Sequence, residues 1–429
     1  MREYVITLHN FDDLDEFYLD METPGGNLFI PNREVEVTHR RAVSRNTNYM
    51  LDENEVRQLS QDPRVLAVEL SMEEQGIKLG PLVETTLITT NIVNETITPT
   101  WTQGAYPVVW DKQNLYYTNV SQKNWGLLRC VEGVQRLGWG KDSATKYFFN
   151  TIINVTASGK NVDVVIVDGH INPAHPEYAV NVDGTGGSRV NQFNWFSLNP
   201  QVTGESSSTY VYTPYIGAFV TGNNDHGAHV AGTVAGNTQG WAHDANIYNI
   251  NPYTNSSLYF LDYIKVWHTN KPINPVTGIK NPTITNHSYG PTPYTYSVTA
   301  TTSVSYNGTV YTGPFTSNQL TNWGIYNSGG SITTLARNAS LEADFYDLMQ
   351  AGVIVVSAAG NSYHKIALYS NVGSNEYNNY YVASGTTVYY NRGSTSAAPD
   401  VICVGSISAG QAEEKAASSN CGPRVDIYA

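Results

Sequence analysis

Three apolar strands that end in polar residues constrain the fold most. Residues 161–167 form an almost uninterrupted apolar run that leads into Asp168, and the stretches 283–290 and 352–361 repeat this layout. Continuous apolar strands are typical of parallel sheets, because helices cover both faces of such sheets. The helical pattern at 339–350, just before the third run, supports the same interpretation. We therefore predict an α/β domain with a mostly parallel sheet and helices on both faces.

The polar residues at the ends of these strands form a candidate site. The carboxyl ends of parallel strands meet at one edge of a sheet, so Asp168, Ser288 to Gly290 and Asn361 are expected in one crevice. Small residues follow His226 in the run His-Gly-Ala-His-Val-Ala-Gly-Thr, which predicts a helix packed closely on the sheet. An imidazole at the start of that helix can contact a carboxylate at the end of a strand, and a side-chain amide can hold an oxyanion. This combination points to acyl-transfer chemistry.

Each of these residues also has an ordinary structural interpretation. An Asp that ends a strand is commonly a turn or cap residue, and a Gly-Asn pair such as the one at Asn361 is commonly a turn. A single His such as His226 is commonly solvated or satisfied by a neighbour. The joint arrangement, and no single residue, favours the catalytic interpretation.

Residues 1–72 carry a different pattern, which predicts a separate small unit. The predicted elements are a strand at 4–8, a helix at 14–21, strands at 34–38 and 43–51, a helix at 52–59 that begins with a capping box, and a strand at 65–70. The order βαββαβ is that of a ferredoxin-like sandwich. Residues 73–120 are predicted to be an extended linker with one or two strands, and residues 121–429 to be the larger domain.

Charge and composition exclude several partners. The net charge of −13 argues against nucleic acid, because phosphate binding needs clustered Lys and Arg. The three cysteines cannot all be paired, and no spacing of them suggests a metal site. No signal peptide and no apolar stretch of about 18 residues is apparent, so no membrane partner is expected. The low charged fraction of 14% suits an extracellular or virion surface, and the location is left open between virion-associated and cytoplasmic.

Several blocks of the sequence resemble those of the subtilisin-like serine proteases. They are Val-Ile-Val-Asp168-Gly-His-Ile, His226-Gly-Ala-His-Val-Ala-Gly-Thr, Ser357-Ala-Ala-Gly-Asn361 and the strand Thr285-Asn-His-Ser-Tyr-Gly290, and they occur in the family's order. The resemblance assigns Asp168, His226 and Asn361 to catalysis, and Ser288, Tyr289 and Gly290 to substrate binding. It implies an endopeptidase that acts on peptide or protein substrates. It does not settle whether structural Ca²⁺ is present and assigns no ligands to it.

The N-terminal unit resembles the inhibitory prodomain of these enzymes. This resemblance implies a proenzyme whose prodomain acts in cis, with the segment after residue 72 bound as an added strand beside Ser288 to Gly290. After Gly290 comes an insertion in which residues 303–312 predict a hairpin with an Asn307-Gly308 turn. We expect this hairpin to border the same cleft.

The family's nucleophile block, Gly-Thr-Ser-x-Ala-x-Pro, has no match at its proper place. Residues 393–399 imitate it, but their Ala-Ala-Pro places Thr395 rather than Ser396 at the nucleophile position. They also precede the strand at 401–405, which in the family comes before the nucleophile. We therefore expect the catalytic Ser beyond residue 429 and an inactive chain without it. The alternative is a non-catalytic structural or binding protein on the same fold, such as a virion or surface component.

Overall fold

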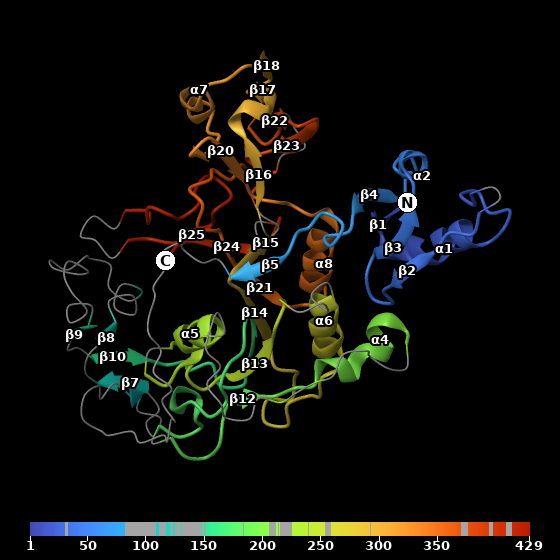
Figure 1. The fold of residues 1–429 in the computed structure, drawn as a ribbon. Coiled ribbons are helices and arrows are strands. Elements are labelled where there is room, and N and C mark those ends of the chain that lie inside the picture. The colour runs from blue at the N-terminus through green and yellow to red at the C-terminus, as the bar shows by residue number, and fades with distance from the viewer. Residues whose placement is uncertain are drawn as a thin grey trace.

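The computed structural model describes residues 1–81 and 152–429 apart from short gaps, together with a few short segments between these ranges. The gaps are 31–32, 183, 206–211, 213, 215–224, 239, 254–258, 292, 370–375, 394–397 and 409–413, and the segments described between 82 and 151 are 109–110, 117–120, 123–124, 130 and 148–149. Figure 1 shows a small N-terminal unit beside a larger domain. Within the described residues, no helix is long and apolar enough to cross a membrane.

A seven-stranded parallel sheet forms the centre of the larger domain, as the sequence predicts. Its strands, in spatial order, are β12 (Val190–Asn191), β13 (Asn246–Ile250), β11 (Asp163–Val167), β14 (Thr283–His287), β21 (Ile354–Ala358), β24 (Ile402–Gly405) and β25 (Ile427–Tyr428). Val167 at the end of β11 pairs with Ile250 on one side and with His287 on the other. The ends of β13, β11 and β14 therefore lie side by side, and Asp168 is the residue directly after β11.

Helices cover both faces of this sheet, which explains the uninterrupted apolar strands. Val164 and Ile166 of β11 join the core beneath α5 (Asp225–Ala235), whereas Val165 and Val167 join the core beneath α6 (Phe260–Asn270) and α8 (Ala339–Gln350). The alternation follows from the period of two in a strand. In Figure 1, α5 lies on one side of the strands and α6 and α8 lie on the other.

The N-terminal unit has the predicted βαββαβ order. Its elements are β1 (Arg2–Leu8), α1 (Leu14–Glu22), β2 (Val37–Arg40), β3 (Asn46–Leu51), α2 (Glu53–Leu59) and β4 (Val65–Leu70), and its antiparallel sheet has the order β2-β3-β1-β4. The capping box of Asp52 and Glu55 is present. The prediction of a strand at 43–51 was wrong at its start, because the side chains of Ser44 and Arg45 bond to α8 instead. The strand predicted at 34–38 is found a few residues later, as β2.

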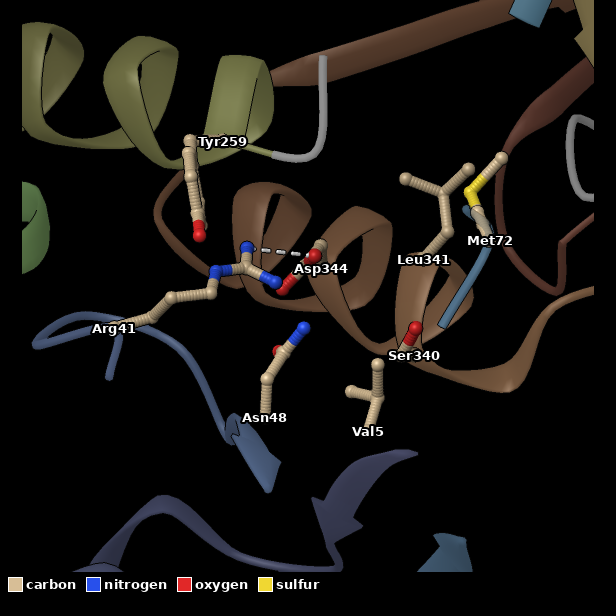
Figure 2. Close-up of a pocket in the computed structure, with 8 residues that line it drawn as sticks. All are labelled: Val5, Arg41, Asn48, Met72, Tyr259, Ser340, Leu341 and Asp344. Atoms are coloured by element: carbon tan, nitrogen blue, oxygen red, sulfur yellow. Dashed lines mark hydrogen bonds and ion pairs between the residues drawn. The ribbon is translucent and has the colours of Figure 1, made fainter. Parts of the chain in front are cut away.

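Buried ion pairs join the N-terminal unit to α6 and α8. The guanidinium of Arg41 donates to Asp262 and to Asp344, each at 2.7 Å, and all three side chains are buried. Figure 2 shows Arg41 reaching from the N-terminal unit to Asp344 on α8. Beside them lies a cavity of about 10 Å³, roughly the space that one water needs. The amide nitrogen of Asn48, which lines this cavity, has no hydrogen-bond partner in the structure, so a buried water is expected there.

The segment after β4 continues along the larger domain and pairs with the strand that follows β14. β5 (Leu79–Pro81) is antiparallel to β15 (Tyr289–Pro291), with Gly80 opposite Gly290. Neither Pro81 nor Pro291 has an N–H, so Gly80 and Gly290 are the pair able to exchange two main-chain hydrogen bonds. The expected contact beside Gly290 is therefore present (Figure 1).

The described residues hold several further short elements. β5, β6 (Val109–Trp110) and β7 (Tyr117–Val120) are three strands within 73–120, where one or two were predicted. The others are β8 (Lys123–Asn124), β9 (Phe148–Phe149), β10 (Ile152–Val155), α4 (Asn199–Thr203) and four short 3₁₀ turns at Phe11–Asp13, Pro176–Tyr178, Trp195–Leu198 and Val298–Ala300.

The insertion after β15 forms a lobe with its own core. It contains β16 (Tyr294–Ser297), β17 (Thr301–Tyr306), β18 (Thr309–Thr312), α7 (Ser317–Asn322), β19 (Asn327–Ser328), β20 (Ser331–Thr334), β22 (Tyr380–Ala383) and β23 (Thr386–Tyr389). The predicted hairpin is β17–β18, whose turn residues Asn307 and Gly308 have φ of 49° and 80°. Figure 1 shows this lobe beyond the β15 end of the sheet.

Candidate functional site

Asp168 and His226 are in contact, as the sequence predicts. Asp168 follows β11 directly and its side chain is fully buried. His226 lies in the first turn of α5, and its Nδ1 is 2.8 Å from Oδ2 and 2.9 Å from Oδ1 of Asp168. The imidazole remains 29% exposed, so Asp168 holds its Nδ1 while part of the ring stays accessible to solvent. A carboxylate at Nδ1 favours the tautomer that carries its proton there.

A glycine lets α5 approach the end of β11 this closely. A Cβ at Gly227 would lie 2.3 Å from the carbonyl oxygen of Gly169, which is far inside van der Waals contact. The hydroxyl of Tyr178 also holds this end of α5, because it donates to the carbonyl of Ala228 at 2.5 Å. The run of small residues after His226 therefore serves the contact between helix and strand end.

One asparagine from β13 and one tyrosine from the loop after it hold Asp168, and no sequence pattern pointed to either. The side-chain amide of Asn249 donates to the carbonyl oxygens of Asp168 and Gly169 at 3.2 and 2.9 Å. The hydroxyl of Tyr253 donates to Oδ1 of Asp168 at 3.2 Å. The backbone N–H of Gly169 donates to the same oxygen at 2.6 Å. Asp168 is thus fixed through both its main chain and its carboxylate.

Asn361 lies in the loop that follows β21, the strand that pairs with β14 in the sheet. Its side chain is partly exposed. The preceding Gly360 has a φ of 106°, which favours glycine. The side chain of Asn420 holds this loop through three hydrogen bonds. Its Oδ1 accepts from the backbone N–H groups of Ser362 and His364 at 3.0 and 2.9 Å, and its amide donates to the carbonyl of Ala359 at 2.8 Å. Asn420 is fully buried, and sequence reasoning missed it.

The predicted substrate-binding residues differ in what they present. Gly290 offers its main chain to β5. Tyr289 is only 2% exposed, and its hydroxyl lies 2.9 Å from Nδ1 of His287 inside the core. Burial raises the pKa of Tyr289 well above 10 and lowers that of His287 to about 3, so both are neutral near pH 7. The Ser288 hydroxyl donates to the side-chain oxygen of Asn286 at 3.0 Å. The side chain of Tyr289 therefore packs in the core and supports the strand, and a role of Tyr289 in substrate binding stays a prediction.

A family model described as the subtilase family matches residues 159–429, well over half of the chain. The chain belongs to the subtilase family. As a subtilase it is a serine-type peptidase, a hydrolase that acts on peptides or proteins. The resemblance inferred from the sequence blocks is thereby confirmed.

Solved structures that match this subtilase are also subtilisin-like. A cold-adapted subtilisin-like serine proteinase is 16% identical, with a TM-score of 0.36 and a match that covers 72% of each chain. The epidermin leader peptide processing serine protease of Staphylococcus aureus is 11% identical, with a TM-score of 0.42, over 100% of this chain and 74% of that one. Fervidolysin of Fervidobacterium pennivorans, a keratinolytic enzyme related to subtilisin, is 16% identical, with a TM-score of 0.40, over 100% and 46%. No curated protein matches the chain.

Two further predictions for this subtilase concern a nucleophile and a metal. Thr395 and Ser396, which imitate the nucleophile block, lie outside the described residues. In the part of the chain that the structure describes, no group of three or more His, Cys, Asp or Glu side chains could hold a metal ion. Structural Ca²⁺ remains a prediction without assigned ligands.

Proposed function

We propose that this subtilase is a serine endopeptidase made as a proenzyme, with Asp168, His226 and Asn361 in its catalytic machinery. The observation that carries the proposal is the 2.8 Å contact between Nδ1 of the partly exposed His226 and the fully buried carboxylate of Asp168. A buried carboxylate that faces an accessible imidazole at the edge of a parallel sheet is the arrangement that activates a hydroxyl nucleophile.

Each side chain then has one task in peptide hydrolysis. Nε2 of His226 takes the proton of the nucleophilic serine as its oxygen attacks the peptide carbonyl, and later gives it to the leaving amine. Asp168 keeps the proton on Nδ1 and stabilises the imidazolium. The amide of Asn361 donates to the oxyanion of the tetrahedral intermediate. The loop clamp by Asn420 supports this role, because an oxyanion donor is effective only when it is held in place.

The nucleophile is assigned from the family's order and from no described residue. We place it in a Gly-Thr-Ser block on the C-terminal side of β25. A fluorophosphonate probe followed by peptide mapping tests this assignment in the protein isolated from its natural source. The label is expected on a serine outside residues 1–429, and the chain 1–429 alone is expected to stay unlabelled. Labelling of Ser396, or of no serine at all in the natural protein, would contradict the proposal.

The N-terminal unit would act as an inhibitor by filling the cleft with β5. Substrate peptides commonly bind such proteases by adding a strand, and β5 pairs with β15 at the position that a substrate strand would take. The buried ion pairs of Arg41 hold the unit in place. Because main-chain bonds require few particular side chains, the same site accepts a variety of peptide sequences.

Hydrogen exchange tests this occlusion on the chain 1–429. The variant Gly80→Pro removes the N–H that faces Gly290, so the Gly290 amide should exchange at least about tenfold faster, while amides of β11 keep their protection. Glu73→Ala, an exposed change in the same segment, serves as the control and should alter neither. Unchanged protection at Gly290 in Gly80→Pro would rule out the docked strand.

A further inference from the structure

Tyr253 contacts the carboxylate of Asp168, the same group that contacts His226. It lies just after β13, and the side-chain oxygen of Asn251 accepts from its backbone N–H at 2.8 Å. Its hydroxyl donates to Oδ1 of Asp168 at 3.2 Å. Its ring meets that of Tyr289 edge-on, with 6.5 Å between centroids. Tyr253 is therefore fixed at its backbone, its ring and its hydroxyl.

Both oxygens of Asp168 lie close to Nδ1 of His226, but they differ in their other partners. Oδ1 accepts from the N–H of Gly169 at 2.6 Å and from the hydroxyl of Tyr253 at 3.2 Å. A carboxylate oxygen has about two lone-pair sites, so these two donors occupy Oδ1. Nδ1 of His226 lies 2.8 Å from Oδ2 and 2.9 Å from Oδ1, and the two donors already on Oδ1 make Oδ2 the better acceptor for the imidazole proton. The Tyr253 hydroxyl thus orients the carboxylate toward the histidine.

We propose that Tyr253 is a positioning residue that sets the proton affinity of His226 through Asp168. A hydrogen bond to Oδ1 disperses the negative charge of the carboxylate, which weakens its attraction for an imidazolium at Nδ1. The catalytic meaning of this control rests on the proposed function, because only a general base needs a tuned pKa. The contact itself does not depend on that function.

Asp168 is the charged group to which the Tyr253 hydroxyl is hydrogen-bonded. Burial raises the pKa of the Tyr253 phenol, and the carboxylate of Asp168 adds to the rise, so the phenol remains a donor at all ordinary pH values. Tyr289 is likewise neutral, and burial lowers the pKa of His287 to about 3. A change at Tyr253 is therefore passed to His226 through Asp168.

The test is an NMR titration of His226 in the chain 1–429. Tyr253→Phe keeps the ring against Tyr289 and removes only the hydroxyl. The pKa of His226 should rise by about 0.5 unit, a roughly threefold gain in proton affinity, because the carboxylate charge becomes less dispersed. The matched control is Tyr248→Phe on β13, whose ring packs on Trp267 with 4.5 Å between centroids. It should leave the pKa of His226 unchanged.

An unchanged or lowered pKa of His226 in folded Tyr253→Phe would overturn the proposal. A second measurement needs no variant: the hydroxyl proton of Tyr253 should exchange slowly enough to be observed, and exchange at the solvent rate would contradict the hydrogen bond. Neither readout uses peptidase activity. If the pKa of His226 shifts in Tyr253→Phe but the natural protein that carries its serine hydrolyses no peptide, the proposed function alone is refuted. If that natural protein is active but the pKa of His226 does not shift, this inference alone is refuted.

Discussion

At the scale of single residues, the contact between Asp168 and His226 depends on the absence of a side chain at Gly227. A Cβ there would meet the carbonyl oxygen of Gly169 at 2.3 Å, and the backbone on both sides is fixed. Gly232, one and a half turns along the same helix, has only the Tyr178 hydroxyl near its Cβ position, at 3.9 Å. The two glycines therefore make a matched pair.

Gly227→Ala should lower the free energy of unfolding by about 1–3 kcal/mol, because α5 must move away from the end of β11. Gly232→Ala should leave it unchanged or raise it by up to about 1 kcal/mol, since alanine favours a helix. Urea unfolding of the chain 1–429 measures both. Equal effects of the two substitutions would show that the close approach at Gly227 is not required.

The site residues that could be predicted from the sequence are reactive side chains that stand next to a recognisable local pattern. Asp168 ends an apolar strand and His226 starts a run of small residues, so both were visible. Asn249 and Asn420 were not, because they act through backbone groups that only the fold brings near. Asn420, for example, lies 61 positions along the chain from the Ala359 carbonyl that it bonds.

At the scale of elements, the docking of the N-terminal unit on α6 and α8 depends on buried charges. Arg41 bonds Asp262 and Asp344 at once, and the carboxylate of Glu69 on β4 accepts from the backbone N–H of Ala339 at 2.8 Å, at the positive end of α8. Burial raises the pKa of Asp262, although Arg41 opposes the rise. Removing Arg41 would leave two buried carboxylates without their partner.

Arg41→Met should therefore lower the free energy of unfolding by about 3–5 kcal/mol. Protonation of Asp262 would reduce this loss of stability, because it removes one of the two unpaired buried charges. Arg57→Met is the control, because Arg57 is exposed on α2, and it should change the free energy by less than about 0.5 kcal/mol. Denaturant unfolding near pH 8, where protonation recovers least, is the measurement. A loss below about 1 kcal/mol for Arg41→Met would mean that the ion pairs do not hold the unit.

The elements themselves were predictable where periodicity was strong and capping was local. The helix at 339–350 was predicted to the residue, and so was the capping box of Asp52. The start of β3 was wrong, because Ser44 and Arg45 have strand-compatible sequence but bond across to α8. Tertiary partners that are distant in sequence override local pattern in such segments.

At the scale of the whole molecule, two buried neutral histidines make stability depend on pH. Burial lowers the pKa of His287 to about 3 and that of His364 to about 4, against 6.5 for an exposed imidazole. Below about pH 6.5 the unfolded chain binds protons that the folded chain does not bind. Their contribution to stability is complete above pH 6.5 and is lost as the pH falls toward the folded pKa values.

The chain 1–429 should therefore become less stable on acidification, with each histidine adding about 1.4 kcal/mol per pH unit between about pH 5.5 and 4.5. His287→Gln should reduce this slope by that amount, because glutamine stays neutral in both states. His9→Gln, at an exposed position, should leave the slope unchanged. Urea unfolding at several pH values measures the slopes, and an identical slope in His287→Gln would show that His287 is protonated in the folded chain.

The overall architecture followed from the order of apolar strands and helical patterns, and the path of β5 along β15 followed only from the family resemblance. The internal arrangement of the lobe after β15 was not predictable beyond its hairpin. Its strands β22 and β23 come from residues 380–389 and join a sheet begun at residue 301, so that no local signal reveals the pairing.

In the proposed mechanism the carboxylate of Asp168 orients His226 for peptide hydrolysis. The most direct measurement is kcat for a peptide substrate with the protein that carries its serine, compared with its Asp168→Asn variant. Asparagine keeps the shape of the side chain but favours the wrong imidazole tautomer, so kcat should fall by about 10⁴ while the fold is retained. A kcat within about tenfold of the unaltered protein would show that Asp168 does not orient His226 for catalysis.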